Sequence, residues 1–154
     1  AEASGVKTAF TFSDPAIVQH FHNELTETIG DGIDLLFCNE AEALGYTGKD
    51  SIEEAMEVIK TFTRSFAITL GSKGALIYDG SQLHRIKPFP ITAVDSNGAG
   101  DMFAGAYLYG ITHGYAAPEA GKLASLAASQ VVQQFGPRLP VENYRKLLDG
   151  VSAA

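Results

Sequence analysis

The hydrophobic and polar positions of this chain alternate between short apolar runs and longer stretches with helical spacing. Residues 33–38 (IDLLFC) are almost continuously apolar, which is typical of a strand covered on both faces. Shorter runs rich in strand formers predict further strands at 7–12, 66–70, 75–78 and 83–86. Asp79-Gly80 lies between the last two and predicts a hairpin turn.

Helical patterns fill most of the spaces between these strands. Asp14-Pro15 predicts the start of a helix that extends to Ile29, and Ser51 with Glu54 three residues later reads as a capping box. Helices are also predicted at 39–44, 99–111, 118–135 and 140–148. The segment 99–111 is apolar nearly all round and should therefore be buried. This alternation predicts an α/β fold with a mainly parallel sheet flanked by helices.

The composition narrows the class of protein without identifying it. The chain has 154 residues with 45% hydrophobic and 19% charged side chains, which predicts one globular domain. A formal net charge of −7 disfavours nucleic-acid binding. No apolar run is long enough for a membrane span, and residues 1–5 do not resemble a signal peptide. The single cysteine, Cys38, fits a reducing compartment, so we expect a cytoplasmic protein.

The strongest chemical signal is the segment Asp95 to Asp101. Gly98, Ala99 and Gly100 lie between an expected strand end and the apolar helix, where backbone N–H groups and the helix dipole can hold a phosphate. Asp101 falls in the first helical turn, where its carboxylate would face that anion and could deprotonate a substrate hydroxyl. A tight turn followed by an ordinary helix-start aspartate is the alternative interpretation.

The same segment closely resembles the C-terminal signature of the PfkB (ribokinase-like) carbohydrate kinase family over residues 95–105, with Ser96 as a mild departure from threonine. Three other stretches agree with that family in order and spacing: residues 39–42, 69–74 and 123–140. The resemblance spans essentially the whole chain. It implies a ribokinase-like (Rossmann-like) three-layer sandwich, of which residues 1–154 would be the ATP-binding part.

The resemblance also implies roles for the residues around the phosphates. Asp101 would be the catalytic base, and the N–H groups of Gly98, Ala99 and Gly100 would bind the transferring phosphate. Asp95 would belong to a monovalent-cation site, for example for K⁺, and the alternative interpretation, which the sequence slightly favours, is a structural loop aspartate.

Further residues would bind ATP and Mg²⁺ if the resemblance holds. Asn39 and Glu42 would hold magnesium and its waters, with Glu42 acting indirectly. The triphosphate and ribose would meet Thr69, Gly71 and Gly74, and the adenine would meet Ser125, Ala128 and Val131. Each set has a structural alternative: Asn39 as a simple helix cap, the two glycines as a turn, and the last three residues as helix packing.

The activity implied is transfer of the γ-phosphate of Mg-ATP to a hydroxyl of a small substrate. Residues 126–138, 39–43 and 13–15 resemble the bacterial adenosine-kinase-like branch, which favours a nucleoside such as adenosine. A free-sugar kinase of the ribose or fructose type, a catalytically silent nucleotide-binding module and an unrelated phosphate-binding domain remain alternatives.

The sequence also resembles one that starts in the middle of a fold, because its first expected strand begins almost at the N-terminus with no helix before it. Members of the PfkB family are roughly twice as long, and their N-terminal half carries the lid and most substrate contacts. We therefore expect the missing N-terminal half to be a partner of this chain, and a homodimer is a further expectation. The chain alone should have little activity and should self-associate through its unpaired sheet edge.

Overall fold

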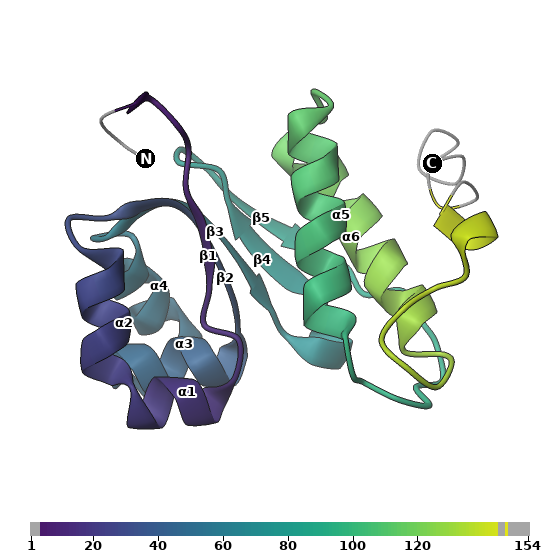
Figure 1. Ribbon diagram of the computed structural model, residues 1–154, viewed down its shortest axis with the longest axis horizontal. Coiled ribbons are helices and arrows are strands. Elements are labelled where there is room, and N and C mark those ends of the chain that lie inside the picture. Colours follow the sequence, from purple (N-terminus) through teal and green to yellow (C-terminus); the bar gives the residue numbers. More distant parts are fainter. Residues whose placement is uncertain (1–3, 145–146, 148–154) are drawn as a thin grey trace. The chain divides into compact units, whose positions relative to one another are not determined.

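The computed structural model describes residues 4–144 and Leu147, and these residues form two compact units (Figure 1). Unit 1 comprises Ala1–Leu70 and Tyr78–Leu83, and unit 2 comprises Gly71–Ile77 and His84–Ala154. The expected α/β architecture with mainly parallel strands is confirmed. In the described part of the chain, no helix is both long and apolar enough to cross a membrane.

Unit 1 is a parallel sheet with connecting helices. Its three strands, β1 (Ala9–Thr11), β2 (Ile33–Asn39) and β3 (Thr63–Thr69), are hydrogen-bonded in that order. The connections are α1 (Pro15–His20), α2 (His22–Ile29), α3 (Glu40–Thr47) and α4 (Ile52–Ile59). Because crossovers between parallel strands are right-handed, consecutive strands in this order place all four helices on the same face of the sheet, where Figure 1 shows them.

Strand β2 forms the centre of the unit 1 core, as its apolar sequence predicts. Leu36 has no exposed surface, and the side chains from Leu35 to Cys38 are all buried. Its neighbour in β3 is Phe66, which is also fully buried and pairs in register with Leu36. A strand of this composition is stable only when both of its faces are covered.

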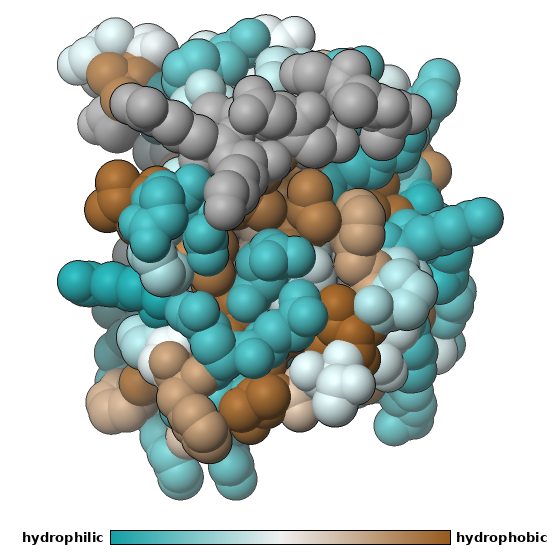
Figure 2. Space-filling model, turned by 90° about the vertical axis from the view of Figure 1, so that its right-hand side faces the viewer, coloured by the Kyte–Doolittle hydropathy of each residue, from teal (hydrophilic) through white to brown (hydrophobic). Residues whose placement is uncertain are grey.

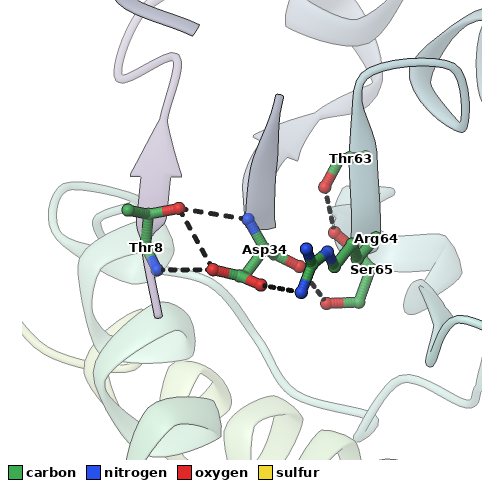
Figure 3. A network of polar contacts seen from close by, with 5 residues as sticks. All are labelled: Thr8, Asp34, Thr63, Arg64 and Ser65. Atoms are coloured by element: carbon green, nitrogen blue, oxygen red, sulfur yellow. Dashed lines mark hydrogen bonds and ion pairs between the residues drawn. The ribbon is translucent and has the colours of Figure 1, made fainter. Parts of the chain in front are cut away.

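A polar network ties the beginnings of the three unit 1 strands together (Figure 3). The carboxylate of Asp34 accepts the backbone N–H of Thr8 at 2.9 Å, and the Asp34 N–H donates to the Thr8 hydroxyl at 3.1 Å. On the other side, Ser65 Oγ donates to the Asp34 carbonyl at 2.7 Å, and Arg64 Nη1 lies 3.1 Å from Asp34 Oδ1. The Arg64 side chain is 83% exposed, so that ion pair adds little, and the hydrogen bonds carry the connection.

Unit 2 consists of a short 3₁₀ turn, η2 (Gly71–Lys73), a hairpin and two long helices. The hairpin strands are β4 (Ala75–Tyr78) and β5 (Leu83–Ile86), and its turn, 78–83, belongs to unit 1. The helices α5 (Ala99–Thr112) and α6 (Ala117–Val131) pack on each other where Gly110 meets Ala120. Gly121 of α6 lies against Ile77 and Ile86, so α6 also packs on the hairpin.

Several expected boundaries are wrong by a few residues. The helix expected from Pro15 to Ile29 is interrupted at Phe21, whose backbone is not helical (φ −126°, ψ 32°). Helix α6 ends at Val131 instead of continuing to 135. Residues 141–144 are helical, and the rest of the helix expected at 140–148 lies largely outside the described residues. Ser51 accepts the Glu54 N–H at 3.3 Å, which is one of the two bonds of a capping box.

The expectation that α5 is buried all round is also wrong. Phe103 and Tyr107 are buried as expected, but Gly105 is exposed and Tyr109, expected in the core, is 38% exposed. Ile111 is 37% exposed. One side of α5 therefore packs on the rest of unit 2, and another apolar side is left partly exposed by the residues of the unit that the structure describes.

The Asp34 network predicts a defined acid sensitivity. The Thr8 N–H, followed by the weaker Arg64 charge, lowers the pKa of Asp34 below its ordinary value of 3.8. The stability that this carboxylate contributes is therefore complete above pH 3.8 and is lost as the pH falls through the lower pKa of the folded state. Urea midpoints measured from pH 7 to pH 2 should fall less steeply for Asp34→Asn than for the wild type. The exposed Asp50→Asn variant should follow the wild type, and identical slopes for all three proteins would contradict this role.

Two glycines of α5 predict opposite effects of the same substitution. A Cβ at Gly105 meets nothing within 4 Å, so Gly105→Ala should stabilise the chain by about 0.5–1 kcal/mol through helix propensity. A Cβ at Gly110 lies 2.7 Å from the Ala120 Cβ, so Gly110→Ala should destabilise it by about 1–3 kcal/mol through overpacking. Equilibrium unfolding in urea measures both effects. Equal effects at the two sites would mean that the α5–α6 contact is not formed as described.

Candidate functional site

The beginning of α5 has the geometry of an anion-binding site. Gly98 is the N-cap and adopts a left-handed conformation (φ 77°, ψ 0°), which costs glycine little. Gly100 and Asp101 follow in the first turn and are both exposed. The first N–H groups of an α-helix have no intrahelical acceptor and carry the positive end of the helix dipole. The Ala99 N–H already donates to the Ser96 carbonyl oxygen at 3.3 Å, so it would have to share or exchange this bond to bind an anion.

The loop before α5 is fixed to the end of α6. The N–H groups of Val94 and Asp95 both donate to the Val132 carbonyl, at 2.7 and 3.2 Å. The Asp95 carboxylate accepts the N–H of Asn97 at 3.0 Å and of Gly136 at 3.1 Å. These two bonds lower the pKa of Asp95. Asp95 thus holds the loop in place, and its role toward a monovalent cation stays a prediction.

Two candidate residues of unit 1 lie side by side at the carboxyl edge of its sheet. Asn39 and Thr69 end β2 and β3, and they are register partners in the parallel pair. Ligands of open α/β sheets bind at this edge of the strands. Motifs thirty residues apart in the sequence are therefore brought together by the register.

Asn39 and Glu42 form a complete capping box at the start of α3. The Asn39 Oδ1 accepts the Glu42 N–H at 2.8 Å, and Glu42 accepts the Asn39 backbone N–H at 2.9 Å and the Asn39 Nδ2–H at 2.7 Å. Glu42 is only 4% exposed, and burial raises its pKa although the Asn39 N–H opposes the shift. Both carboxylate oxygens of Glu42 accept a hydrogen bond from Asn39, and the role of Glu42 toward a cation stays a prediction.

No acidic or histidine cluster in the described part of the chain could hold a metal ion by itself. Groups of three or more His, Cys, Asp or Glu side chains with suitable placement are absent from those residues. Cys38 is buried, and burial raises the pKa of its thiol, which fits a packed side chain and not a nucleophile. A magnesium ion here would depend on oxygen atoms of the substrate phosphates in addition to protein atoms.

The remaining predicted residues belong to unit 2 and differ in accessibility. Gly71 is exposed with open space around it, whereas Gly74 is buried against the Ile86 backbone. On α6, Ser125 and Ala128 are half-buried, and Ser125 Oγ lies 3.5 Å from the Lys87 carbonyl oxygen. Val131 has no exposed surface and packs in a core cluster with Ala127, Leu139 and Leu147. Contact of these residues with ATP stays a prediction.

Sequence reasoning missed a pocket of about 600 Å³ in unit 2 that begins at Asp101 and extends along α5. Its lining is mostly apolar: Asp101, Met102, Gly105, Ala106, Tyr109, Leu123, Ala127, Pro137, Arg138, Tyr144 and Leu147. The five α5 residues recur at intervals of three or four, so they share one side of the helix. That spacing was visible in the sequence, but the apolar character all round the helix hid which side would stay open.

Comparison with known proteins shows what the chain is similar to. Residues 1–143 match the model of a protein family that is described as pfkB family carbohydrate kinase. A cytidine kinase from Thermococcus kodakarensis is 33% identical over 116 residues, which are 73% of this chain and 42% of that protein.

Two solved structures share the fold. The adenosine kinase from Sinorhizobium meliloti matches all of this chain and 47% of its own chain, with a TM-score of 0.89 and 33% identity. A putative ribokinase II from Escherichia coli, solved with ATP and Mg²⁺, covers 97% of this chain and 50% of its own, with a TM-score of 0.83 and 20% identity. The chain thus spans about half the length of the relatives that it matches.

The loop geometry predicts different outcomes at two neighbouring glycines. A Cβ at Gly98 would lie 2.7 Å from the Pro137 Cα, and the φ of 77° is strained for alanine, so Gly98→Ala should destabilise the chain by about 1–3 kcal/mol. A Cβ at Gly100 meets nothing within 4 Å, so Gly100→Ala should leave stability within about 1 kcal/mol of the wild type or raise it. Thermal and urea unfolding measure both. Similar destabilisation by the two changes would show that the loop does not rest on Pro137.

Proposed function

The chain belongs to the PfkB family of carbohydrate kinases, and we propose that it is the ATP-binding part of a kinase that phosphorylates a hydroxyl group of a small molecule. The observation that carries this proposal is Asp101, an exposed carboxylate on the first turn of α5, directly after the left-handed Gly98. A carboxylate beside an anion-binding helix terminus is suited to deprotonating a hydroxyl while the helix holds a phosphate.

The proposed reaction is a single in-line displacement. The acceptor oxygen forms a bond to the γ-phosphorus as the bond between that phosphorus and the bridging oxygen of ADP breaks. The hydroxyl proton passes to the Asp101 carboxylate, and ADP leaves with the electron pair of the broken bond. Because the transition state of phosphoryl transfer is loose, Asp101 needs to orient the hydroxyl more than it needs to be a strong base.

The backbone at the start of α5 would stabilise the charge on the transferring group. The N–H groups of Gly98, Ala99 and Gly100 and the helix dipole would provide the positive potential. Such groups work best when they are already fixed before the reaction. The bonds from Val94, Asp95 and Gly136 supply that rigidity within unit 2.

For unit 1, we propose residues that would also contact the nucleotide. Asn39 and Thr69 occupy the carboxyl edge of the sheet, and Glu42 would hold the Asn39 amide in one orientation. Magnesium bound with ATP would neutralise phosphate charge, with the half-buried Asn39 as the polar group that approaches it and the buried Glu42 acting through Asn39. The Escherichia coli ribokinase II complex with ATP and Mg²⁺ supports these cofactors at the level of the fold. As a binding site for K⁺, we propose only the loop that contains Asp95.

For the acceptor, we favour a nucleoside of the adenosine type. Relatives at 33% identity include an adenosine kinase and a cytidine kinase, which supports this class. A free sugar is the second candidate, since the family as a whole is described as carbohydrate kinases. We further propose that activity requires the half of the relatives' polypeptide that this chain does not span. The 154 residues alone should therefore convert little substrate.

Substitution of the proposed base tests the function. In a complete polypeptide that contains this chain, ADP release should require one acceptor among adenosine, inosine, ribose and fructose. Asp101→Asn should lower kcat by about 10²–10⁴-fold, since it removes the general base. The exposed Glu53→Gln on α4 is the matched control and should leave kcat unchanged.

Each other outcome has a defined meaning. Turnover that survives Asp101→Asn would remove Asp101 from the mechanism. ATP binding with no turnover on any acceptor would favour the silent nucleotide-binding module. Absence of ATP binding in the complete polypeptide would refute the kinase proposal itself.

A further inference from the structure

Arg138 has a fixed backbone position in the loop that follows α6. Pro137, directly before it, lies against the N-cap of α5, with its Cα 2.7 Å from the place that a Gly98 Cβ would take. Leu139, directly after it, is buried in a core cluster of unit 2. The Arg138 carbonyl also accepts the Gln134 Nε2–H at 2.7 Å. The backbone of Arg138 is therefore held on both sides, close to the N-terminus of α5.

The Arg138 side chain is exposed and lines the same pocket as the proposed base. Among the described lining residues of this 600 Å³ pocket, which we call the Asp101 pocket, Asp101 and Arg138 are the two charged ones. Figure 2 shows a face of the molecule on which hydrophilic residues lie among hydrophobic ones. Arg138 forms no ion pair with any residue that the structure describes. No described carboxylate therefore competes with an incoming anion for its guanidinium group.

A phosphate at the start of α5 would be only partly neutralised by the helix. The helix terminus supplies about half a positive charge, and the Ala99 N–H already donates to the Ser96 carbonyl oxygen at 3.3 Å. The Asp101 carboxylate in the first turn has the same sign of charge as the phosphate and would repel it. A full positive charge in the same pocket would offset this repulsion. Arg138 is the described lining residue that carries one.

The chemistry of the guanidinium group suits a phosphate that is being transferred. The group stays protonated at any working pH and presents its N–H donors as a planar fork, which can bind two phosphate oxygens at once. In a loose transition state the negative charge spreads over the three equatorial oxygens of the phosphoryl group. A fork of donors stabilises that charge. Because the Arg138 backbone is already fixed, only its side chain has to be ordered on binding.

We propose that Arg138 binds the transferring γ-phosphate of ATP and holds it beside Asp101. This inference rests on the proposed function, because it requires a phosphate at the start of α5. Position favours the γ-phosphate over a phosphate group on the acceptor: Pro137 places Arg138 beside Gly98, whose N–H is a proposed ligand of the transferring group. Arg138 is then a third component of the site, in addition to the base and the helix terminus.

A comparison of ATP with ADP tests the proposal without turnover. In a complete polypeptide that contains this chain, calorimetric titration without an acceptor measures the affinity for each nucleotide, and the two differ only in the γ-phosphate. Arg138→Gln should weaken ATP binding about tenfold and ADP binding less than about twofold, because one charge-assisted contact to the γ-phosphate is lost. Arg138→Lys should give an intermediate loss, since lysine keeps the charge without the fork. The exposed Lys49→Gln removes the same charge from unit 1 and should leave both affinities unchanged.

Chemical rescue separates a phosphate contact from a structural role. Arg138→Ala should lower kcat about 10²-fold, which is the loss typical of removing one preorganised donor. Guanidinium ion, added below the concentrations that unfold the protein, should restore part of that kcat, whereas tetramethylammonium ion, which has no N–H donors, should not. Because the Arg138 side chain is exposed, the variant should unfold at the same urea concentration as the wild type.

The possible results distinguish this inference from the proposed function. Equal changes in ATP and ADP affinity in Arg138→Gln, or no change in either, would overturn the role of Arg138 and leave Asp101 as the proposed base. A loss confined to the KM of a phosphorylated acceptor such as fructose 6-phosphate would place the contact on the acceptor and would also overturn it. A selective loss of ATP affinity in a protein that releases no ADP with any acceptor would support the phosphate contact and contradict the kinase function. A wild type that binds no ATP would overturn both.

Discussion

The parallel pairing of β2 with β3 determines where every candidate residue of unit 1 lies. In-register pairing sets Asn39 beside Thr69 at one edge of the sheet and Asp34 beside Thr8 and Ser65 at the other. A slip by one residue would turn the buried side chains of β2 toward the opposite face. The polar network around Asp34 therefore supports the candidate site from the far end of the strands, because it fixes the register that aligns the two motifs.

Unit 2 solves a different problem, since its candidate residues lie on a loop and a helix terminus. Loops are usually the more mobile parts of a fold. Here the Val132 carbonyl, the Gly136 N–H and the Pro137 backbone confine the segment from Val94 to Gly98. The end of α6 thus acts as the platform on which the start of α5 is oriented. Rigid support of this kind is what an anion-binding terminus requires if it is to contribute to catalysis.

Local patterns in the sequence predicted the strands, the hairpin turn and the start of most helices, because caps, turns and apolar runs act over a few residues. The break at Phe21 carries no local signal of that kind. The exposure of Tyr109 could not be read from the sequence either, since a helix that is apolar on all sides does not show which side its own domain covers. The roles of residues 98–101 were predicted from small residues before an apolar helix and from the family resemblance, whereas the capping box of Asn39 with Glu42 became clear only from its hydrogen bonds.

The contact of Gly74 with the Ile86 backbone has a consequence for how mutational data on this family should be interpreted. Any side chain at that position would collide with the Ile86 carbonyl, and the φ of +93° adds strain. Intolerance of substitution there would therefore report the hairpin and not a nucleotide, even though the residue belongs to a glycine motif near the proposed phosphate site. Gly71 has open space around it but a φ of +58°, so only a residue that tolerates the left-handed region, such as asparagine, can test whether a ligand restricts this position. Asparagine at each of the two glycines would thus separate architecture from recognition within four residues of sequence, because only the Gly74 position lacks space for any side chain.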